Sequence, residues 1–278
     1  MSFLVAKADG TTEIFNHAKL LHSLMKSGAE NDIAEDIVHG IEKEYGGSGH
    51  SIITTHEIYA RAFDILRESK RPAAARYSLK RAVLDFGPSG FPFESYLEQL
   101  FMLDGYEAKT DQIVKGGCTE HEVDIVLTKE KDGKKETIYV EAKFHNSPAF
   151  KSDLKVALYV KARIDDLRAA GHTEARGILA TNTKFTDRAL EYAECQGLEL
   201  LSWDYPQGGT LHERIEKARL YPVTALTSLS RREKTALLEA KIVLCSQLLS
   251  QSEILGSLGV SGHKAQLILE EAGALCSS

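Results

Sequence analysis

The spacing of hydrophobic and polar positions divides the chain into three segments with different secondary structure. Residues 1–88 follow a mainly helical pattern, residues 89–205 mix helical and strand patterns, and residues 206–278 follow a helical pattern without further strand signals. The run GPSGFPF at 87–93 is rich in glycine and proline, which interrupt helices and strands. We therefore expect three modules, the first two of which are joined near this run.

The first module opens with two short β-prone stretches on either side of Asp9-Gly10. An Asp-Gly pair in such a place is typical of a hairpin turn. After Asn16, whose side chain can cap a helix, apolar residues recur at helical spacing in four successive stretches. Thr54 or Thr55 opens the third stretch, and 73–86 forms the fourth. This order predicts a hairpin followed by four helices.

The middle module has the pattern of a mixed sheet. The helical stretch FESYLEQLFMLDG precedes the strand-like stretches YEAKTDQIV, HEVDIVLTK and ETIYVEAKF, the last two joined by a turn at Asp132-Gly133. An amphipathic stretch from about Ser152 to Ala170 follows, and then a strand, a helix and a strand. The order α-β-β-β-α-β-α-β is typical of an α/β domain whose mixed β-sheet carries helices on both faces.

Charge and cysteine usage restrict the function only weakly. The net charge is −6, and the acidic excess lies in the middle module. This suits a cation site, because carboxylates that bind Mg²⁺ count as negative until the metal arrives, but a solvated acidic surface explains most of these residues. The scattered cysteines fit a reducing cytoplasm and argue against a disulfide framework or structural zinc; they are Cys118, Cys195, Cys245 and Cys276. Neither a signal peptide nor a membrane span is expected.

The first module resembles the ATP-cone, the regulatory nucleotide-binding domain of ribonucleotide reductases and of their transcriptional repressor. The resemblance covers residues 3–86. It rests on the following residues: Val5, Lys7, Asp9 and Gly10 in V-x-K-x-D-G, then Glu13, Phe15, Asn16, Lys19 and Leu20, then Ile53, Thr55 and Ile58 in I-x-T-x-x-I, and Tyr77 in the final helix.

This resemblance implies that ATP or dATP binds as a regulatory ligand. The implied nucleotide contacts are Val5, Lys7, Glu13, Asn16, Lys19 and Thr55. Ala8 stands where the family usually has arginine, which removes one phosphate partner. A charged hydrogen bond of this kind contributes about 1.5–3 kcal/mol. Taken alone, the two lysines could equally be solvated surface residues.

Three charged residues of the middle module fall on two successive predicted strands. Asp124 lies in EVDIVL, and Glu141 and Lys143 lie at the end of TIYVEAKF. Residues i and i+2 of a strand point to the same face, so Glu141 and Lys143 project together. If the two strands pair, Asp124 can lie opposite Glu141. Two carboxylates would then share a cation beside an ammonium group, as phosphodiester hydrolysis requires.

The middle module is similar to the PD-(D/E)xK nucleases, and in particular to the Mrr-type restriction endonucleases. FESYLEQLF matches the family's first helix, and GILATNTKFTDRALEYAECQGLELLSWD matches its last strand–helix–strand. Gly116-Gly117 precedes the aspartate as in the family, and Val123 replaces the proline of the name. The resemblance implies that Mg²⁺ or Mn²⁺ is held by Asp124, Glu141 and Glu94, and that Lys143 orients the attacking water.

Each of these residues has an alternative interpretation. Glu122 lies on the same face as Asp124 and could be the ligand instead, although the apolar run after Asp124 favours the aspartate. Glu141 and Lys143 could form a cross-strand ion pair of little energetic value. Glu94 could be a helix-face acid. His145 is interpreted as a surface histidine rather than a base.

The third module contains the stretch LGVSGHKAQLIL, which resembles a helix-hairpin-helix, a motif that offers backbone amides to a DNA phosphate. Ser261 replaces its second glycine, and a plain helical packing module explains the stretch equally well.

Together these patterns predict a Mg²⁺-dependent endonuclease that hydrolyses DNA phosphodiester bonds under the control of ATP or dATP. Restriction-type cores need two active sites to cut both strands, and cones self-associate, so a homodimer or larger oligomer is expected. The protein is expected in the cytoplasm without membrane contact. The alternative is a nucleotide-sensing DNA-binding regulator whose nuclease fold does not cut; the intact set of Asp124, Glu141 and Lys143 argues against it.

Overall fold

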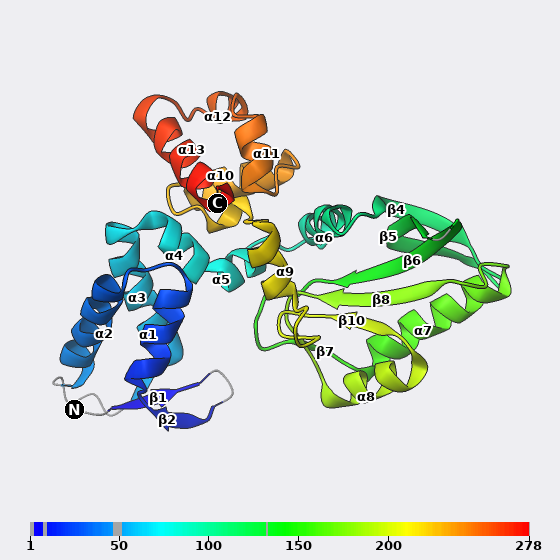
Figure 1. Ribbon diagram of the computed structural model, residues 1–278, viewed down its shortest axis with the longest axis horizontal. Helices are drawn as coiled ribbons and strands as arrows, with labels where there is room; N and C mark the ends of the chain where they lie inside the picture. Colours follow the sequence, from blue (N-terminus) through cyan, green and yellow to red (C-terminus); the bar gives the residue numbers. More distant parts are fainter. Residues whose placement is uncertain (1–2, 8–9, 47–51, 132, 278) are drawn as a thin grey trace. The chain divides into compact units, whose positions relative to one another are not determined.

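A computed structural model describes residues 3–7, 10–46, 52–131 and 133–277 (Figure 1). The chain divides into two compact units. Unit 1 takes in the described residues up to Ala82, Tyr221–Leu237 and those from Cys245 onward; unit 2 takes in Val83–Leu220 and Leu238–Leu244. Three residues with a predicted feature lie outside the described residues. They are Ala8, where the sequence departs from the ATP-cone pattern, and Asp9 and Asp132, which were each predicted to lie in a turn.

Unit 1 combines a small sheet with helices. Strands β1 (Leu4–Ala6), β2 (Thr12–Ile14) and β3 (Ile52–Thr54) form a sheet in the order β2-β1-β3, in which β1 is antiparallel to β2 and parallel to β3. The helices are α1 (His17–Lys26), α2 (Asn31–Gly46), α3 (Thr55–Ser69), α4 (Arg71–Tyr77) and α5 (Leu79–Leu84). The predicted hairpin is therefore present, and β3 adds a strand that the sequence pattern did not indicate.

Short polar residues set the helix boundaries of unit 1. Asn16 Oδ1 accepts the backbone N–H of Lys19 at 3.0 Å, which confirms Asn16 as the cap of α1. Thr54 caps α3 in a reciprocal pair with Glu57, a capping box. The stretch 73–86, predicted as one helix, is divided at Ser78, whose hydroxyl donates to the carbonyl of Ala75 at 3.1 Å. Serine side chains compete in this way with helical hydrogen bonds.

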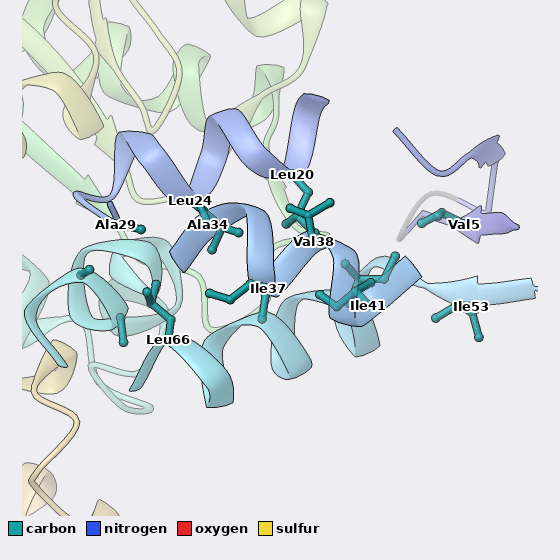
Figure 2. Close-up of a cluster of buried hydrophobic side chains, with 14 of the residues drawn as sticks. Val5, Leu20, Leu24, Ala29, Ala34, Ile37, Val38, Ile41, Ile53 and Leu66 are labelled. Carbon is teal, nitrogen blue, oxygen red and sulfur yellow. The ribbon is translucent and has the colours of Figure 1, made fainter. Parts of the chain in front are cut away.

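The N-terminal part of unit 1 has a core of apolar side chains from the sheet and the helices (Figure 2). The members from the helices follow the predicted helical spacing: Leu20 and Leu24 of α1, Ile37, Val38 and Ile41 of α2, and Leu66 of α3. Val5 and Ile53 come from the sheet. All eight are at most 9% exposed. Burial of a side chain of this size stabilises a fold by about 1.5–3 kcal/mol relative to exposure, so this cluster holds α1, α2 and α3 together.

Unit 2 is built on a mixed sheet of five strands in the order β10-β8-β6-β5-β4. Its strands are β4 (Glu107–Lys115), β5 (Glu120–Lys131), β6 (Lys134–Lys143), β8 (Arg176–Thr181) and β10 (Glu199–Leu201). Strand β5 is antiparallel to both of its neighbours, β4 and β6, whereas β6, β8 and β10 are parallel to one another. The predicted α/β fold is confirmed. A short parallel pair, β7 (Lys151–Ser152) and β9 (Lys184–Phe185), was not predicted.

Helices cover both faces of this sheet. The helices are α6 (Phe91–Leu103), α7 (Leu154–Ala169) and α8 (Asp187–Gln196) (Figure 1). Ile138 and Ile178 line a cavity of about 790 Å³ with Leu100 of α6. Their neighbours Tyr139 and Leu179 belong to the apolar cluster of α7 and α8. Because successive side chains of a strand point to opposite faces, α6 and the α7–α8 pair lie on opposite faces.

The turn at Gly116-Gly117 approaches α7 closely. The N–H of Gly117 donates to the carbonyl of Asp166 at 3.0 Å. A Cβ atom at Gly116 would lie 2.1 Å from Oδ2 of Asp166, which is far inside van der Waals contact. Glycine is therefore required at position 116, and the turn fixes the start of β5 against α7.

Residues after Pro206 are helical, as predicted. Helix α9 (Leu211–Ala218) belongs to unit 2, whereas α11 (Cys245–Ser250), α12 (Ile254–Ser257) and α13 (Gly262–Cys276) belong to unit 1. Helix α10 (Arg231–Glu239) lies between them in the sequence, after a 3-10 turn at Val223–Ala225. Within the described part of the chain, no helix combines the length and apolar character needed to cross a membrane.

Helix α13 packs against α4, and both helices belong to unit 1. Nη2 of Arg76 donates to the carbonyl of Ala274 at 3.1 Å. Glu271 of α13 is 4% exposed and accepts hydrogen bonds from the backbone and hydroxyl groups of Thr227 and Ser228. A buried carboxylate is costly unless it is hydrogen-bonded, so these four donors fix the 227–228 loop to α13.

Candidate active site

Strands β5 and β6 pair as the sequence pattern predicts. Ile125 is registered with Val140 in an antiparallel pair, and one further step places Asp124 opposite Glu141. Oδ2 of Asp124 accepts the N–H of Ala142 at 2.7 Å, across the two strands. Both carboxylates are partly buried. The structure therefore brings together two acidic side chains that are separated by a whole hairpin in the sequence.

A buried arginine reaches this pair from α7. Nη1 of Arg163 lies 2.5 Å from Oε2 of Glu141, and the side chain of Arg163 is 8% exposed. Nη2 donates to the hydroxyl of Tyr159, and the guanidinium lies 4.8 Å from the centre of that ring. Nε of Arg163 is buried without a hydrogen-bond partner among the described residues. The positive charge of Arg163 therefore faces the carboxylate of Glu141.

Glu94 lies in the first turn of α6, close to the end of β6. The ring of Phe93 lies 5.9 Å from that of Phe144, which places this turn beside the residue that follows Lys143. Burial raises the pKa of Glu94 to about 7, with contributions from the negative charges of Asp124, Asp111, Glu141 and Glu122. The three predicted acidic residues therefore act on one another electrostatically.

Asp111 is a further acidic residue of this region, and it has an unusual backbone. The register of β4 and β5 pairs Thr110 with Ile125 and Gln112 with Val123, which leaves Asp111 across from Asp124. The φ angle of Asp111 is 52°, in the left-handed region that residues other than glycine seldom adopt. Such conformations cost energy and concentrate at functional sites.

The charges of the site suit a divalent cation. Burial raises the pKa of Asp124, and burial together with the charge of Asp124 raises the pKa of Glu141. Carboxylates in this condition repel each other, and a cation bound between them removes that cost. Their oxygen atoms are the hard ligands that Mg²⁺ and Mn²⁺ prefer. The donor set therefore fits such a metal.

The ligand atoms do not converge fully in this arrangement. Within the described ranges, one group brings three side-chain ligand atoms to within 4.8 Å of one another, and it lies in unit 1 rather than at Asp124, Glu141 and Glu94. At Glu141 the reason is visible, since Arg163 holds one carboxylate oxygen. Metal binding at this site would therefore require a small rearrangement of that ion pair.

Lys143 and His145 lie at the end of β6. Lys143 is exposed; its positive charge partly opposes the rise in the pKa of Glu141 and contributes to the lowered pKa of His145. His145 is partly buried rather than a plain surface residue: its ring Nε2 lies 3.1 Å from the hydroxyl of Ser152, and its backbone exchanges two hydrogen bonds with the side chain of Asn182. Burial is the main cause that lowers the pKa of His145, which keeps the ring neutral.

Unit 1 contains a second candidate site, a cavity of about 360 Å³. Five of the six residues expected to contact a nucleotide line it, namely Val5, Glu13, Asn16, Lys19 and Thr55. The sixth, Lys7, is absent from the lining, but its Nζ lies 2.6 Å from Glu13, whose other oxygen lies 3.0 Å from Lys19. These two lysines lower the pKa of Glu13.

Two tyrosines and a further lysine complete this cavity. The rings of Tyr59 and Tyr77 are stacked with their centres 5.1 Å apart, and both line the cavity together with Lys80. The volume lies within the range of small-molecule sites, about 300–1,000 Å³. The cavity therefore combines flat aromatic surface with positive charge.

Comparison with known protein families finds three domains that match successive parts of the chain. The ATP cone domain matches residues 3–83, a restriction endonuclease domain of the Mrr type matches residues 88–205, and the C-terminal domain of AF1548-like proteins matches residues 221–276.

Two individual proteins are similar over most of their length. A protein of Archaeoglobus fulgidus described as uncharacterized is 38% identical over 169 residues, which are 60% of this chain and 92% of that protein. The crystal structure of the protein of unknown function AF1548 has 34% sequence identity and a TM-score of 0.55, and the match covers 68% of this chain and 100% of that chain. The chain therefore belongs to the AF1548-like family, and this chain carries both an ATP-cone domain and a restriction endonuclease domain of the Mrr type.

Proposed function

We propose that this protein is an endonuclease that hydrolyses DNA phosphodiester bonds with Mg²⁺ or Mn²⁺. The observation that carries the proposal is the pairing of β5 with β6, which sets Asp124 against Glu141 beside Lys143 in a domain of the restriction endonuclease type. Asp124 and Glu141 would hold the metal, and Glu94 would assist from α6. When bound, the ion would acidify a water molecule and polarise a phosphoryl oxygen.

The side chains of this chain have separate parts in that reaction. Lys143 is exposed at the end of β6, where its ammonium group can stabilise negative charge on the phosphate in the transition state. Glu94 has a pKa of about 7, so it can both accept and donate a proton near neutral pH. Arg163 holds Glu141 in position in the absence of metal.

The unit 1 cavity supports regulation by an adenine nucleotide. Tyr59 and Tyr77 offer an apolar face to a base, and Lys19 and Lys80 offer positive charge to phosphates. We propose that ATP or dATP binds there and controls cleavage. Both ligands share the adenine and phosphate groups, and direct binding measurements with ATP, dATP and ADP distinguish them.

We also propose that the working enzyme is a homodimer or a larger oligomer, because cutting both strands of a duplex needs two active sites. Light scattering across a concentration series tests this. A monomer that linearises plasmid in one encounter would contradict it.

The test of the activity is incubation of supercoiled plasmid with the protein and Mg²⁺ or Mn²⁺, with and without ATP and dATP. Nicked or linear product from the parent, and none from Asp124→Asn or Glu141→Gln, is the expected result. Binding of DNA without cleavage under every combination would replace this proposal by a nucleotide-sensing DNA-binding regulator that has a nuclease fold.

A further inference from the structure

A cluster of two histidines and two glutamates lies between α1 and α2 of unit 1. His17 belongs to α1, and Glu35, His39 and Glu42 belong to α2. The two imidazole rings lie with their centres 5.3 Å apart. Ligand atoms of His17, His39 and Glu42 all lie within 4.8 Å of one another. None of these residues belongs to the candidate active site or lines the nucleotide cavity.

The two carboxylates face opposite sides of the two rings. Glu42 faces both Nδ1 atoms, at 3.0 Å from His17 and 3.3 Å from His39. Glu35 faces both Nε2 atoms, at 3.2 Å from His17 and 3.7 Å from His39. Ligands that bind Zn²⁺ tetrahedrally at about 2.0–2.1 Å lie about 3.3–3.4 Å apart. The contacts of Glu42 with the Nδ1 atoms are close to that spacing.

A neutral His17 ring does not have enough N–H donors to make a hydrogen bond to both carboxylates that face it. A neutral imidazole has one N–H donor and one nitrogen acceptor, whereas an ionised carboxylate only accepts. His17 has a carboxylate within hydrogen-bond distance of each of its two nitrogens, so one nitrogen of the neutral ring faces an acceptor without a hydrogen to offer. A cation bound to that nitrogen resolves the conflict, and the remaining N–H donates to the other carboxylate. Histidine ligands of protein metal sites commonly have such an outer carboxylate.

We propose that Nδ1 of His17, Nδ1 of His39 and the carboxylate of Glu42 bind a transition-metal ion of the Zn²⁺ kind, and that Glu35 orients the His17 ring through its Nε2–H group. Two imidazoles and one carboxylate suit Zn²⁺ better than Mg²⁺, which prefers oxygen ligands alone. Three protein ligands leave a fourth position to solvent. The charge of a divalent ion balances that of the two carboxylates.

The ion would link the start of α1 to α2. His17 is the first residue of α1, directly after the cap Asn16 and two positions before Lys19, and both of those residues line the nucleotide cavity. A metal held by His17 on one helix and by His39 and Glu42 on the other therefore fixes the helix end that borders that cavity. The site is independent of the nuclease proposal, because all four of its residues belong to unit 1 and none is a residue of the candidate active site.

Equilibrium dialysis of the full chain against Zn²⁺, after removal of metals with a chelator, tests the proposal. The parent should bind one more Zn²⁺ per chain than His39→Ala or Glu42→Gln. His39 is 66% exposed, so its replacement should leave the fold intact. His22→Ala is the control, because His22 is an exposed histidine of α1, the helix of His17, and lies outside the cluster; it should bind as the parent does. Any ion held at Asp124 and Glu141 is common to all variants and cancels in the comparison.

Glu35→Gln distinguishes an outer carboxylate from a ligand. It should keep the ion but weaken its binding about 10–100-fold, as loss of an outer partner does. In Co²⁺-loaded protein, His39→Ala should lose an absorption band that His22→Ala retains. An equal Zn²⁺ count and affinity in the parent and His39→Ala would overturn the proposal, and the two histidines would then be protonated partners of the carboxylates.

Discussion

Nη1 of Arg163 lies 2.5 Å from Oε2 of Glu141, so the carboxylate assigned to a metal is already paired with a buried cation. The pair has a physical reason. Glu141 is 15% exposed and lies beside Asp124, and without metal these two negative charges repel each other. Arg163 offsets that repulsion from α7. Because a metal ion would bring the same compensation, metal and arginine compete for one carboxylate.

Replacement of Arg163 by methionine should therefore destabilise the metal-free protein. Removing one member of a buried ion pair costs about 3–5 kcal/mol, because the partner stays buried and uncompensated. Added Mg²⁺ should raise the melting temperature of Arg163→Met more than that of the parent. Arg168→Met is the control on the same helix: its ion pair with Asp165 is exposed and should matter little. An equal Mg²⁺ response in all three proteins would contradict the competition.

The catalytic residues should behave as one unit. Asp124→Asn, Glu141→Gln and Lys143→Met should each lower the rate of plasmid cleavage about 10²–10³-fold or more. The double variants should be no slower than the slowest single variant, since residues that act together are strongly non-additive. Glu122→Gln is the matched control, because Glu122 is exposed on the same strand, and it should retain nearly the parent rate. Loss of activity in Glu122→Gln with retention in Asp124→Asn would reverse the assignment.

Glu94 should make stability depend on pH. Its folded pKa is about 7, above the ordinary value of 4.5, so the folded state holds a proton that the unfolded state releases between these values. The contribution of Glu94 is therefore complete below pH 4.5 and is lost as the pH rises through 7. In a metal-free buffer, Glu94→Gln should raise the melting temperature at pH 8 relative to the parent and leave it nearly unchanged at pH 4.5.

The size of that effect follows from the length of the chain. For a protein of this size, 1 kcal/mol corresponds to about 2–4 °C, so a rise of a few degrees is expected. Glu98→Gln, on the next turn of α6, is the comparison variant. Burial raises the pKa of Glu98 too, but of the carboxylates that raise the pKa of Glu94 only Asp111 also raises that of Glu98. A gain that is the same at both pH values would exclude a raised pKa as the cause.

The backbone of Asp111 gives a prediction that does not involve charge. Asp111→Asn, Asp111→Gly and Asp111→Ala all remove the carboxylate, so differences among them report the positive φ angle. Asparagine and glycine tolerate this conformation, whereas alanine is disfavoured there by about 1–2 kcal/mol. Urea denaturation should therefore find the alanine variant less stable than the other two by about that amount. Equal stability of all three would show that β4 relaxes at this position.

Nucleotide binding should depend on Lys19, one of the two lysines that line the cavity. Lys19→Met should weaken ATP binding by a factor of about 10 to 100, corresponding to the loss of a charged hydrogen bond of about 1.5–3 kcal/mol. Lys26→Met at the other end of α1 is the control and should bind ATP as the parent does, since Lys26 is absent from the cavity lining. Calorimetric titration of the full chain measures both. Equal affinities would place the phosphates elsewhere.

The sequence predicted those parts of the structure that depend on local pattern. Asp124 and Glu141 could be placed opposite each other because period-two alternation assigns both stretches to strands and a short turn joins them. The cap at Asn16 was predictable for a similar reason, since its side chain acts on a backbone N–H three residues away. The pairing of the strands and the order of elements followed from such rules.

Features that depend on distant contacts could not be predicted in this way. The left-handed backbone of Asp111 lies within β4, a stretch whose pattern predicts an extended strand, so the local pattern does not indicate this conformation. Arg163 did leave a signal: it stands between Val160 and Ile164 on the apolar side of its helix, where a charge needs a buried partner. That partner, Glu141, is 22 residues earlier, and only the fold shows it.

The contact between Arg76 and Ala274 has a consequence for how the protein is made. These residues are 198 positions apart, yet they belong to one compact unit. During synthesis, domains tend to fold as units once their segments have emerged from the ribosome. The N-terminal segment of unit 1 emerges first but lacks α13 as a packing partner until all of unit 2 has been translated. Unit 2 can therefore finish folding earlier, although its sequence begins later, and the first helices made are among the last to reach their final environment.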